Sequence, residues 1–472
     1  MTAAGPARAH RLSEGMLRAL ASGGGGPEAV RALAAIRHSR DRLLTTALVE
    51  LAHRSGHPQA AAASQAYRVL AEIEHVVPEA VRRVLSYPTV GAWLAGTVRA
   101  LLRPTAGPVA PSALGQVTAA AAVRAGVTTR VPAAGPLVVL PSLGQAWLPG
   151  DEDAFEVRAE PDGPVLCRGS HRVVLTRSGD RSDGPDRAER PARTGLAAGP
   201  AGAVDASGAV GATSAGWTPL HRIVTGAGPL RLAVTLDGPG WRLAPGDGPD
   251  PRLLATVGPA EHRRWRRRTE AGWSLLSRHH QAVAGEVAAA VRVLAPLRRA
   301  PDGLVSGTFR DAFGAVAMSL PPDATALAVT LAHEVQHAKM VGLMSAFQLV
   351  EPGPDERFYA PWREDPRPLG ALLHGTYAHL GVAAFWQRQR RVEEHAESAF
   401  AAHVAFARWR VAAWEATDAL ARTGRLTAEG EVVLDGMRAT LREFLAEPVP
   451  AAARRRADGL AAGHRRRSGA AG

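Results

Sequence analysis

The stretch Ala332-His333-Glu334-Val335-Gln336-His337-Ala338-Lys339 decides how the C-terminal half of this chain is interpreted. It contains an HExxH motif, with His333 and His337 four residues apart. On a helix, side chains at this spacing project from the same face, so both imidazoles can bind one metal ion. Glu334 is placed to act as a base if that metal activates water. The motif therefore predicts a metal-binding helix.

The surroundings of the motif support this prediction, because HExxH spacing alone occurs by chance in many chains. Apolar residues flank the motif, and Asp323 follows Pro321-Pro322 as a candidate N-cap, so we expect a helix over residues 323–347. A strand over residues 307–319 precedes it. This order is typical of zincin-like folds, in which a sheet edge beside the metal helix holds an extended peptide. Two histidines and a glutamate buried without a metal or other partner would be costly.

The third metal ligand is left open by the residues themselves. His374 and His379 lie on the next predicted helix, over residues 369–390, and are five residues apart. Their side chains then point about 140° apart, so both cannot comfortably face one metal. His379 shares its helix face with apolar side chains, which indicates an inward orientation. Carboxylates are the remaining alternatives: Asp311, Glu393 and Glu394.

The composition and patterning predict an α+β protein that is mostly helical. A length of 472 residues gives room for roughly two to four domains. Residues 1–104 have helical periodicity, and residues 105–258 contain short β-like runs around a Gly-, Ala- and Ser-rich insert at 178–215, which we expect to be disordered. Residues 259–450 form the expected zincin-like metal-binding domain. The basic segment 451–472 is expected to be a disordered tail.

The net charge of +12 favours an acidic partner only weakly. The excess arginines are scattered, and no aromatic-studded or recognisable nucleic-acid-binding motif accompanies them. Cys167 is the only cysteine, which excludes an intrachain disulfide framework and a Cys-rich zinc module. The N-terminal residues lack a signal-peptide pattern, and no run of about 18 apolar residues exists. We therefore expect a cytoplasmic protein that binds neither nucleic acid nor membrane; the oligomeric state is not indicated.

Four blocks of the C-terminal half resemble the HExxH-motif peptide-modification proteins of ribosomal peptide natural product pathways, which are interpreted as 2-oxoglutarate-dependent peptide β-hydroxylases. The blocks are residues 311–319 (DAFGAVAMS), 331–339 (LAHEVQHAK), 358–368 (FYAPWREDPRP) and 373–380 (LHGTYAHL). The helical N-terminal region looks similar too, so the resemblance covers most of the chain except the insert and the tail. The combination of the four blocks is specific, whereas any one block is not.

The resemblance implies iron(II), 2-oxoglutarate and dioxygen as cofactor and cosubstrates, and a ribosomal precursor peptide as substrate. It also favours His379 as the third metal ligand beside His333 and His337. In this chemistry Glu334 would be a ligand, a residue that orients a ligand, or a proton carrier.

The distal carboxylate of 2-oxoglutarate would need a cation. Arg363 and Arg367 are the first candidates, because arginine binds carboxylates in a bidentate manner. Lys339, the only lysine in the chain, is the other candidate. It lies two residues after His337, about 200° around the helix, where a buried ion pair that anchors the helix is an equally good interpretation.

Two other function classes are compatible with the motif. A zinc metallopeptidase would use Glu334 as its general base and would need no keto acid. A non-catalytic peptide-binding protein would have no need of an intact HExxH motif. HExxH alone does not select the metal, because the same ligands accept zinc, iron and other divalent ions.

Overall fold

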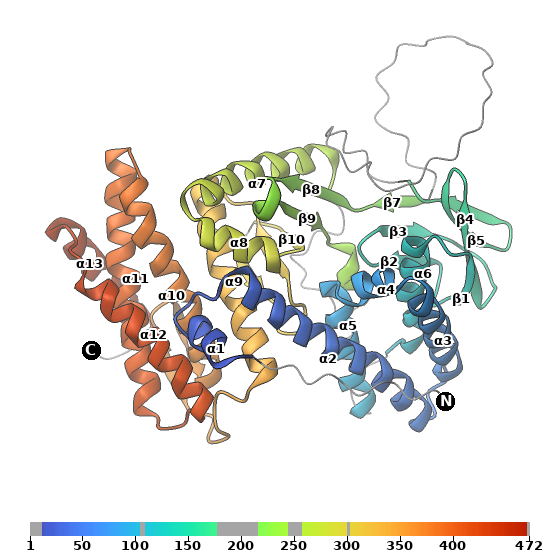
Figure 1. Ribbon diagram of the computed structural model, residues 1–472, viewed down its shortest axis with the longest axis horizontal. Helices are drawn as coiled ribbons and strands as arrows, with labels where there is room; N and C mark the ends of the chain where they lie inside the picture. Colours follow the sequence, from blue (N-terminus) through green and yellow to red (C-terminus); the bar gives the residue numbers. More distant parts are fainter. Residues whose placement is uncertain (1–11, 104–108, 177–215, 244–256, 300–302, 470–472) are drawn as a thin grey trace, which may run out of the picture.

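The computed structural model describes residues 12–103, 109–176, 216–243, 257–299 and 303–469. This part of the chain is mostly helical and contains small β-sheets, in agreement with the α+β class expected from the sequence (Figure 1). The expected disordered insert at 178–215 lies outside the described residues. None of the described helices is long and apolar enough to cross a bilayer.

The N-terminal part combines helices with two antiparallel sheets. One sheet has the strand order β1-β4-β5-β6, and the other has the order β2-β3-β7. Helix α6 packs against α3 and against β1. The bounds are α1 Glu14–Ala21, α2 Gly26–Arg54, α3 Ala60–Val76, α4 Pro78–Leu85, α5 Pro88–Leu102, α6 Leu114–Ala125, β1 Thr129–Pro132, β2 Leu137–Leu140, β3 Gly144–Trp147, β4 Ala154–Glu160, β5 Gly163–Arg168, β6 His171–Val174 and β7 Trp217–Pro219.

A five-stranded mixed sheet joins this part to the HExxH unit. Its order is β11-β12-β10-β9-β8, where β10 pairs in parallel with both β9 and β12, and β11 is an antiparallel outer strand. The boundary predicted at residue 258 falls between β9 and β10 and so divides this sheet. The bounds are β8 His221–Thr225, β9 Leu232–Leu236, α7 Pro259–His279, α8 Gln281–Ala290, β10 Val293–Leu297, β11 Ser306–Thr308 and β12 Ala315–Ser319.

Strands β10 and β12 of this sheet are buried on both faces. Successive side chains on a strand point to opposite faces. On β12, Ala315 and Ala317 pack into the core of the N-terminal part, whereas Val316 and Met318 pack into the core formed with α7, α8 and the HExxH helix. The sheet therefore separates two hydrophobic cores and contributes side chains to both.

The single strand predicted over residues 307–319 was wrong, because the chain reverses within it. Strands β11 and β12 are separate and antiparallel. Between them, Gly314 adopts a φ of +89°, a conformation that favours glycine. The reversal places β11 on the outer edge of the sheet, beside the HExxH helix.

The HExxH segment forms helix α9, Ala324–Ala346, as expected. The carboxylate of Asp323 caps its N-terminus by accepting a hydrogen bond of 2.7 Å from the backbone N–H of Ala326. The helix predicted over residues 369–390 is also confirmed, as α10 Leu369–Val392, and it is followed by α11 Ala396–Arg422. Helix α10 packs against both α9 and α11.

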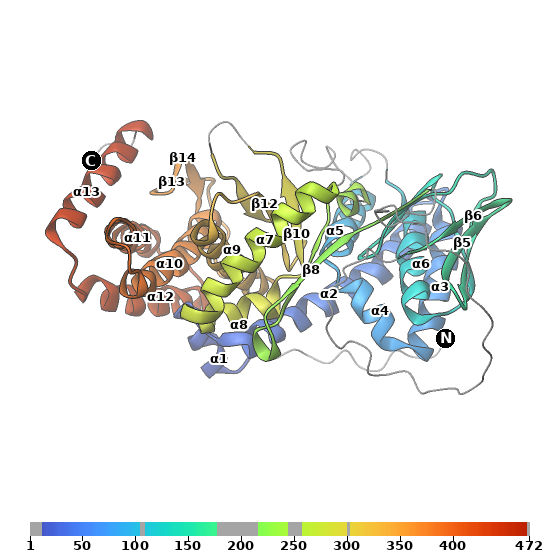
Figure 2. The ribbon, with the colours of Figure 1, turned by 90° about the horizontal axis from the view of Figure 1, so that it is seen from above.

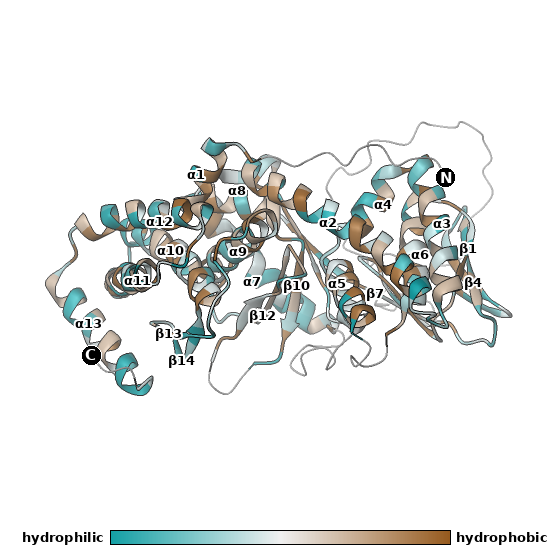
Figure 3. Ribbon diagram, turned by 90° about the horizontal axis from the view of Figure 1, so that it is seen from below, coloured by the Kyte–Doolittle hydropathy of each residue, from teal (hydrophilic) through white to brown (hydrophobic). Residues whose placement is uncertain are grey.

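The Pro-rich segment between α9 and α10 contains a hairpin that was not expected. Strands β13 Arg357–Ala360 and β14 Arg363–Pro368 pair in antiparallel fashion. Strand β14 is largely exposed and hydrophilic (Figure 3).

The disordered tail predicted after residue 450 was wrong for the part that the structure describes. After α12, Ala428–Ala446, residues Ala451–Arg467 form helix α13, which packs against α11. This helix lies at the end of the molecule farthest from β5 and β6 (Figure 2). Its basic residues have acidic partners on the body of the protein: Arg465 pairs with Glu415 and Arg467 with Glu364. Because small residues of α13 are buried as well, the segment has both apolar and ionic reasons to fold.

Candidate metal centre

Four histidines from two neighbouring helices lie together, and we call them the histidine cluster: His333 and His337 of α9, and His374 and His379 of α10. The Nε2 atoms of His333 and His337 are 2.9 Å apart. The rings of His333 and His379 have their centroids 5.0 Å apart, and those of His337 and His374 are 4.3 Å apart. The HExxH pair and both downstream histidines are therefore brought to one place.

The two histidines of α10 occupy different positions around the α9 pair. His379 lies beside His333, with an angle of 79° between the two rings. His374 lies beyond His337, with its Nε2 3.2 Å from Nδ1 of His337. If Nε2 of His337 binds a metal, its Nδ1–H can donate to His374, as ring nitrogens of metal-bound histidines commonly do. In this arrangement His379 is a candidate third ligand, and His374 is a candidate for orienting His337.

His379 is already held with one ring nitrogen free for a metal. Its Nδ1 is 2.9 Å from the carbonyl oxygen of Gly375, one helical turn earlier. A proton on Nδ1 satisfies that carbonyl and leaves the lone pair on Nε2. The Trp362 indole stacks on the imidazole, with centroids 4.3 Å apart, and the ring of Trp409 contacts it at 4.8 Å. Neither tryptophan was assigned to the site in the sequence-based prediction.

Burial keeps the imidazoles of the cluster neutral, which is the form that binds metals. It lowers the pKa of His333 to about 4. Burial also lowers the pKa values of His337 and His379 well below the usual value, and neighbouring histidines lower them further. Solvent still reaches parts of His333 and His337.

Imidazole nitrogens are suitable donors for a divalent metal, but the side chains of the cluster are not arranged to hold one together. Nitrogen–metal bonds of about 2.1 Å place two ligand nitrogens roughly 3 Å apart, close to the spacing of the α9 pair. Across the described ranges, however, no three His, Cys, Asp or Glu side chains are positioned to hold a metal ion together. The geometry is that of a close histidine pair with a third imidazole beside it, so His379 would have to move for all three to hold one metal ion.

Glu334 points from α9 to the outer strand β11. Its two carboxylate oxygens accept hydrogen bonds of 2.8 Å from the hydroxyl of Ser306 and 2.7 Å from that of Thr308. Burial raises the pKa of this carboxyl to about 7, although the two hydroxyls favour the charged form. Glu334 thus ties the metal helix to the sheet edge. Its partners were missed in the sequence because residues 307–319 were interpreted as one strand.

The carboxylates considered as alternative ligands are engaged elsewhere or exposed. Asp311 binds Arg40 at 2.7 Å and Arg99 at 2.6 Å. Glu393 accepts a hydrogen bond from the side chain of Gln389, and Glu394 is exposed. In the part of the chain that the structure describes, no hydrogen bond or ion pair joins any of the three to the histidine cluster.

The three cations predicted to bind a cosubstrate already have partners. Arg363 and Arg367 of β14 both bind Asp365, at 2.8 and 2.9 Å. Lys339 is fully buried, and its Nζ lies 2.9 Å from Glu286 of α8 and 2.7 Å from the carbonyl oxygen of Gly23. The structure therefore places Lys339 in the helix-anchoring ion pair that was the alternative interpretation of this residue.

Comparison with known proteins adds no relative to this description. No model of a known protein family matches the chain, and no curated protein matches it.

Proposed function

We propose that the protein is an iron(II)- and 2-oxoglutarate-dependent hydroxylase that acts at the β-carbon of a side chain in a ribosomally made precursor peptide, in the cytoplasm. The observation that carries the proposal is the donor set: three neutral imidazoles beside one another, from His333, His337 and His379, with no carboxylate among them. Neutral ligands leave the full charge of a divalent metal available, which favours the binding of an anionic keto acid. Three protein ligands also leave positions open for the keto acid and dioxygen.

The position of Glu334 favours this proposal over a metallopeptidase. A peptidase needs this carboxylate to take a proton from a metal-bound water. Here both of its oxygens accept hydroxyl hydrogen bonds from Ser306 and Thr308, so the carboxylate fixes the distance between α9 and the sheet edge. The outer strand β11 supports a peptide substrate, because extended peptides bind to sheet edges by adding a strand.

The histidine cluster and Trp362 have separate proposed roles in this reaction. When bound, iron(II) with 2-oxoglutarate and dioxygen supplies the oxidising power to replace a C–H bond by C–OH. His333, His337 and His379 would hold the metal, and His374 would hold the proton on Nδ1 of His337. Trp362 covers one face of His379 and excludes water from it. For each hydroxylation, one dioxygen and one 2-oxoglutarate are consumed and one succinate and one carbon dioxide are released.

The test uses the anaerobically purified full chain with iron(II), 2-oxoglutarate and a precursor peptide encoded beside its gene. After air is admitted, we expect a peptide heavier by one oxygen atom and one succinate for each oxygen incorporated. Reactions without 2-oxoglutarate, or with zinc in place of iron, serve as controls and should leave the peptide unchanged. Peptide cleavage that is independent of 2-oxoglutarate would overturn the proposal in favour of a zinc peptidase.

A further inference from the structure

Arg408 of α11 is a half-buried cation without an acidic partner in the described part of the chain. Its guanidinium carbon lies 4.5 Å from the centroid of the Trp409 ring, and among the described residues no hydrogen bond or ion pair joins it to a carboxylate. Burial lowers the pKa of Arg408, but arginine at this depth stays protonated. A positive charge removed from water without a counter-charge costs free energy, so this position is suited to an anion.

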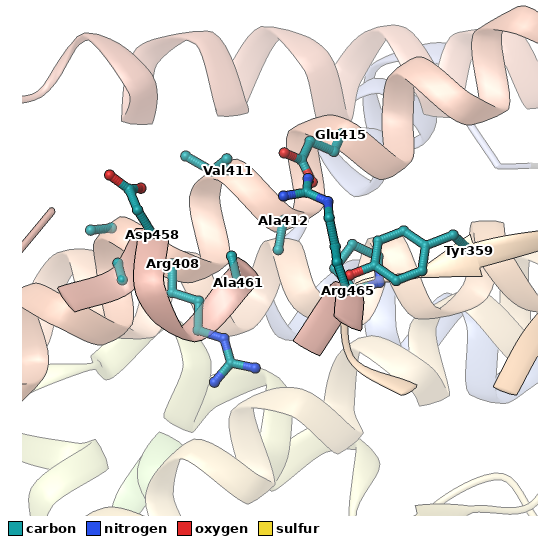
Figure 4. Close-up of a pocket in the computed structure, with 11 residues that line it drawn as sticks. Tyr359, Arg408, Val411, Ala412, Glu415, Asp458, Ala461 and Arg465 are labelled. Carbon is teal, nitrogen blue, oxygen red and sulfur yellow. The ribbon is translucent and has the colours of Figure 1, made fainter. Parts of the chain in front are cut away.

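The neighbouring charged side chains do not neutralise Arg408. It lines a narrow depression between β13, α11 and α13, together with Tyr359, Glu415, Asp458 and Arg465. Arg465 extends to Glu415, whereas the Arg408 guanidinium points away from both Glu415 and Asp458 (Figure 4). Both acids therefore leave Arg408 available.

Arg408 also adjoins the candidate metal centre. The Trp409 ring contacts the Arg408 guanidinium and, at 4.8 Å between centroids, the imidazole of His379. The cation and the third metal ligand thus lie against one indole. The end of β13 and the turn after it also link the depression to the histidine cluster. Tyr359 and Pro361 line the depression, and the next residue in the chain, Trp362, stacks on His379.

A cation at this position matches a ligand with negative charge at both ends. The keto-acid end of 2-oxoglutarate binds a metal, and its far carboxylate needs a cation a short chain away. Of the four cations considered, Arg363 and Arg367 share Asp365, and Lys339 is paired with Glu286, whereas Arg408 is not paired with any carboxylate of the described ranges. Guanidinium binds carboxylate through two parallel hydrogen bonds.

We propose that Arg408 binds the distal carboxylate of 2-oxoglutarate and so selects a dicarboxylic keto acid over a monocarboxylic one. This inference rests on the proposed function, because it assumes that a keto acid binds at the histidine cluster. The cation that binds the cosubstrate is then Arg408 of α11, and not Arg363 or Arg367 of the exposed hairpin β13–β14.

The test measures binding by calorimetry, without turnover, on the full chain loaded with manganese(II). Two keto acids of equal length are compared: 2-oxoglutarate, and 2-oxopentanoate, which lacks the distal carboxylate. The wild type should bind 2-oxoglutarate about 10- to 100-fold more tightly than 2-oxopentanoate. Arg408→Gln should remove most of this preference while 2-oxopentanoate binds as before, and Arg408→Lys should keep part of it. Arg363→Gln and Arg367→Gln are the matched controls and should keep all of it.

The outcomes separate this inference from the proposed function. Retention of the full preference by Arg408→Gln, in a protein with unchanged melting temperature, would overturn the inference and leave the hydroxylase proposal standing. The same holds if Arg408→Gln weakens only the binding of an acidic peptide, since Arg408 would then belong to the substrate. A wild type that binds neither keto acid would overturn both the proposed function and this assignment. If Arg408→Gln is misfolded, the partial preference of Arg408→Lys decides the question.

Discussion

The indole of Trp362 lies nearly parallel to the imidazole of His379, with an angle of 12° between the rings. This stacking depends on Gly375, one turn before His379 on α10. A β-carbon on Gly375 would come within 2.5 Å of Cζ2 of Trp362, closer than two carbons can approach. The absence of a side chain at residue 375 therefore lets the tryptophan lie against the helix and hold the histidine.

Replacement of Gly375 by alanine should lower metal affinity, because Trp362 must move and His379 loses the ring that orients it. We expect a loss of about 10-fold, at the lower end of the effect of removing a residue that positions a metal ligand. Gly370→Ala is the control on the same helix, since nothing lies within 4 Å of its added β-carbon. Competition titration with a zinc chelator measures both variants, and equal affinities would show that the stacking does not position His379.

Alanine replacements at the two histidines of α10 should have unequal effects. His379→Ala removes a proposed ligand, and we expect metal binding to fall by more than 100-fold. His374→Ala removes only the partner of Nδ1 of His337, so a loss of about 10- to 100-fold is expected. Metal content after dialysis against a weak chelator distinguishes the two. If His374→Ala has the larger effect, the assignment of the third ligand has to be reversed.

The Lys339–Glu286 pair should stabilise the fold only while both charges are present. Lys339→Met leaves the buried Glu286 carboxylate without its cation, which typically costs about 3–5 kcal/mol in the free energy of unfolding. The double variant Lys339→Met with Glu286→Leu should recover most of this loss, because an apolar pair can replace a buried ion pair. Denaturant unfolding at equilibrium measures both. A Lys339→Met protein of full stability that no longer binds 2-oxoglutarate would instead make Lys339 the cosubstrate cation.

Asp41 should make stability depend on pH. Burial raises the pKa of this carboxyl to about 7 despite the nearby Arg37 and Arg40, so the folded state binds a proton that the unfolded state releases above about 3.8. Stability from this group is present below about pH 4 and is lost as the pH rises to about 7. At about 1.4 kcal/mol for each pH unit, the full change is about 4 kcal/mol. Asp41→Asn should therefore gain stability relative to wild type between pH 4.5 and 8 in denaturant titrations; a constant difference would contradict the raised pKa.

Local sequence signals predicted the helical elements of the metal centre well. The cap at Asp323, the spacing of His333 and His337 and the periodicity after residue 369 are properties of short segments, and α9, α10 and α11 follow them. The inward orientation expected for His379 also agrees with its burial.

The sequence-based prediction missed features that depend on contacts between residues far apart in the chain. In the sequence, residues 451–467 have the composition of a solvated basic tail. Their acidic partners, Glu415 and Glu364, become neighbours only in the folded protein. Nothing local distinguishes Arg408 from other arginines, because its lack of a carboxylate partner among the residues that the structure describes is a property of its surroundings. The reversal at Gly314 did have a local signal, the glycine itself, which was outweighed by the β-like residues around it.

The sheet that separates the two hydrophobic cores also determines how cooperatively the protein unfolds. Because neighbouring side chains on β12 belong to different cores, neither core can lose its order while the strand stays in place. Parallel pairing of β9 with β10 also joins residues from both sides of position 258. We therefore expect one cooperative melting transition in calorimetry, and fragments cut at residue 258 to be insoluble when produced separately. The candidate metal centre then depends for its stability on the N-terminal part of the chain, which contributes none of its proposed ligands.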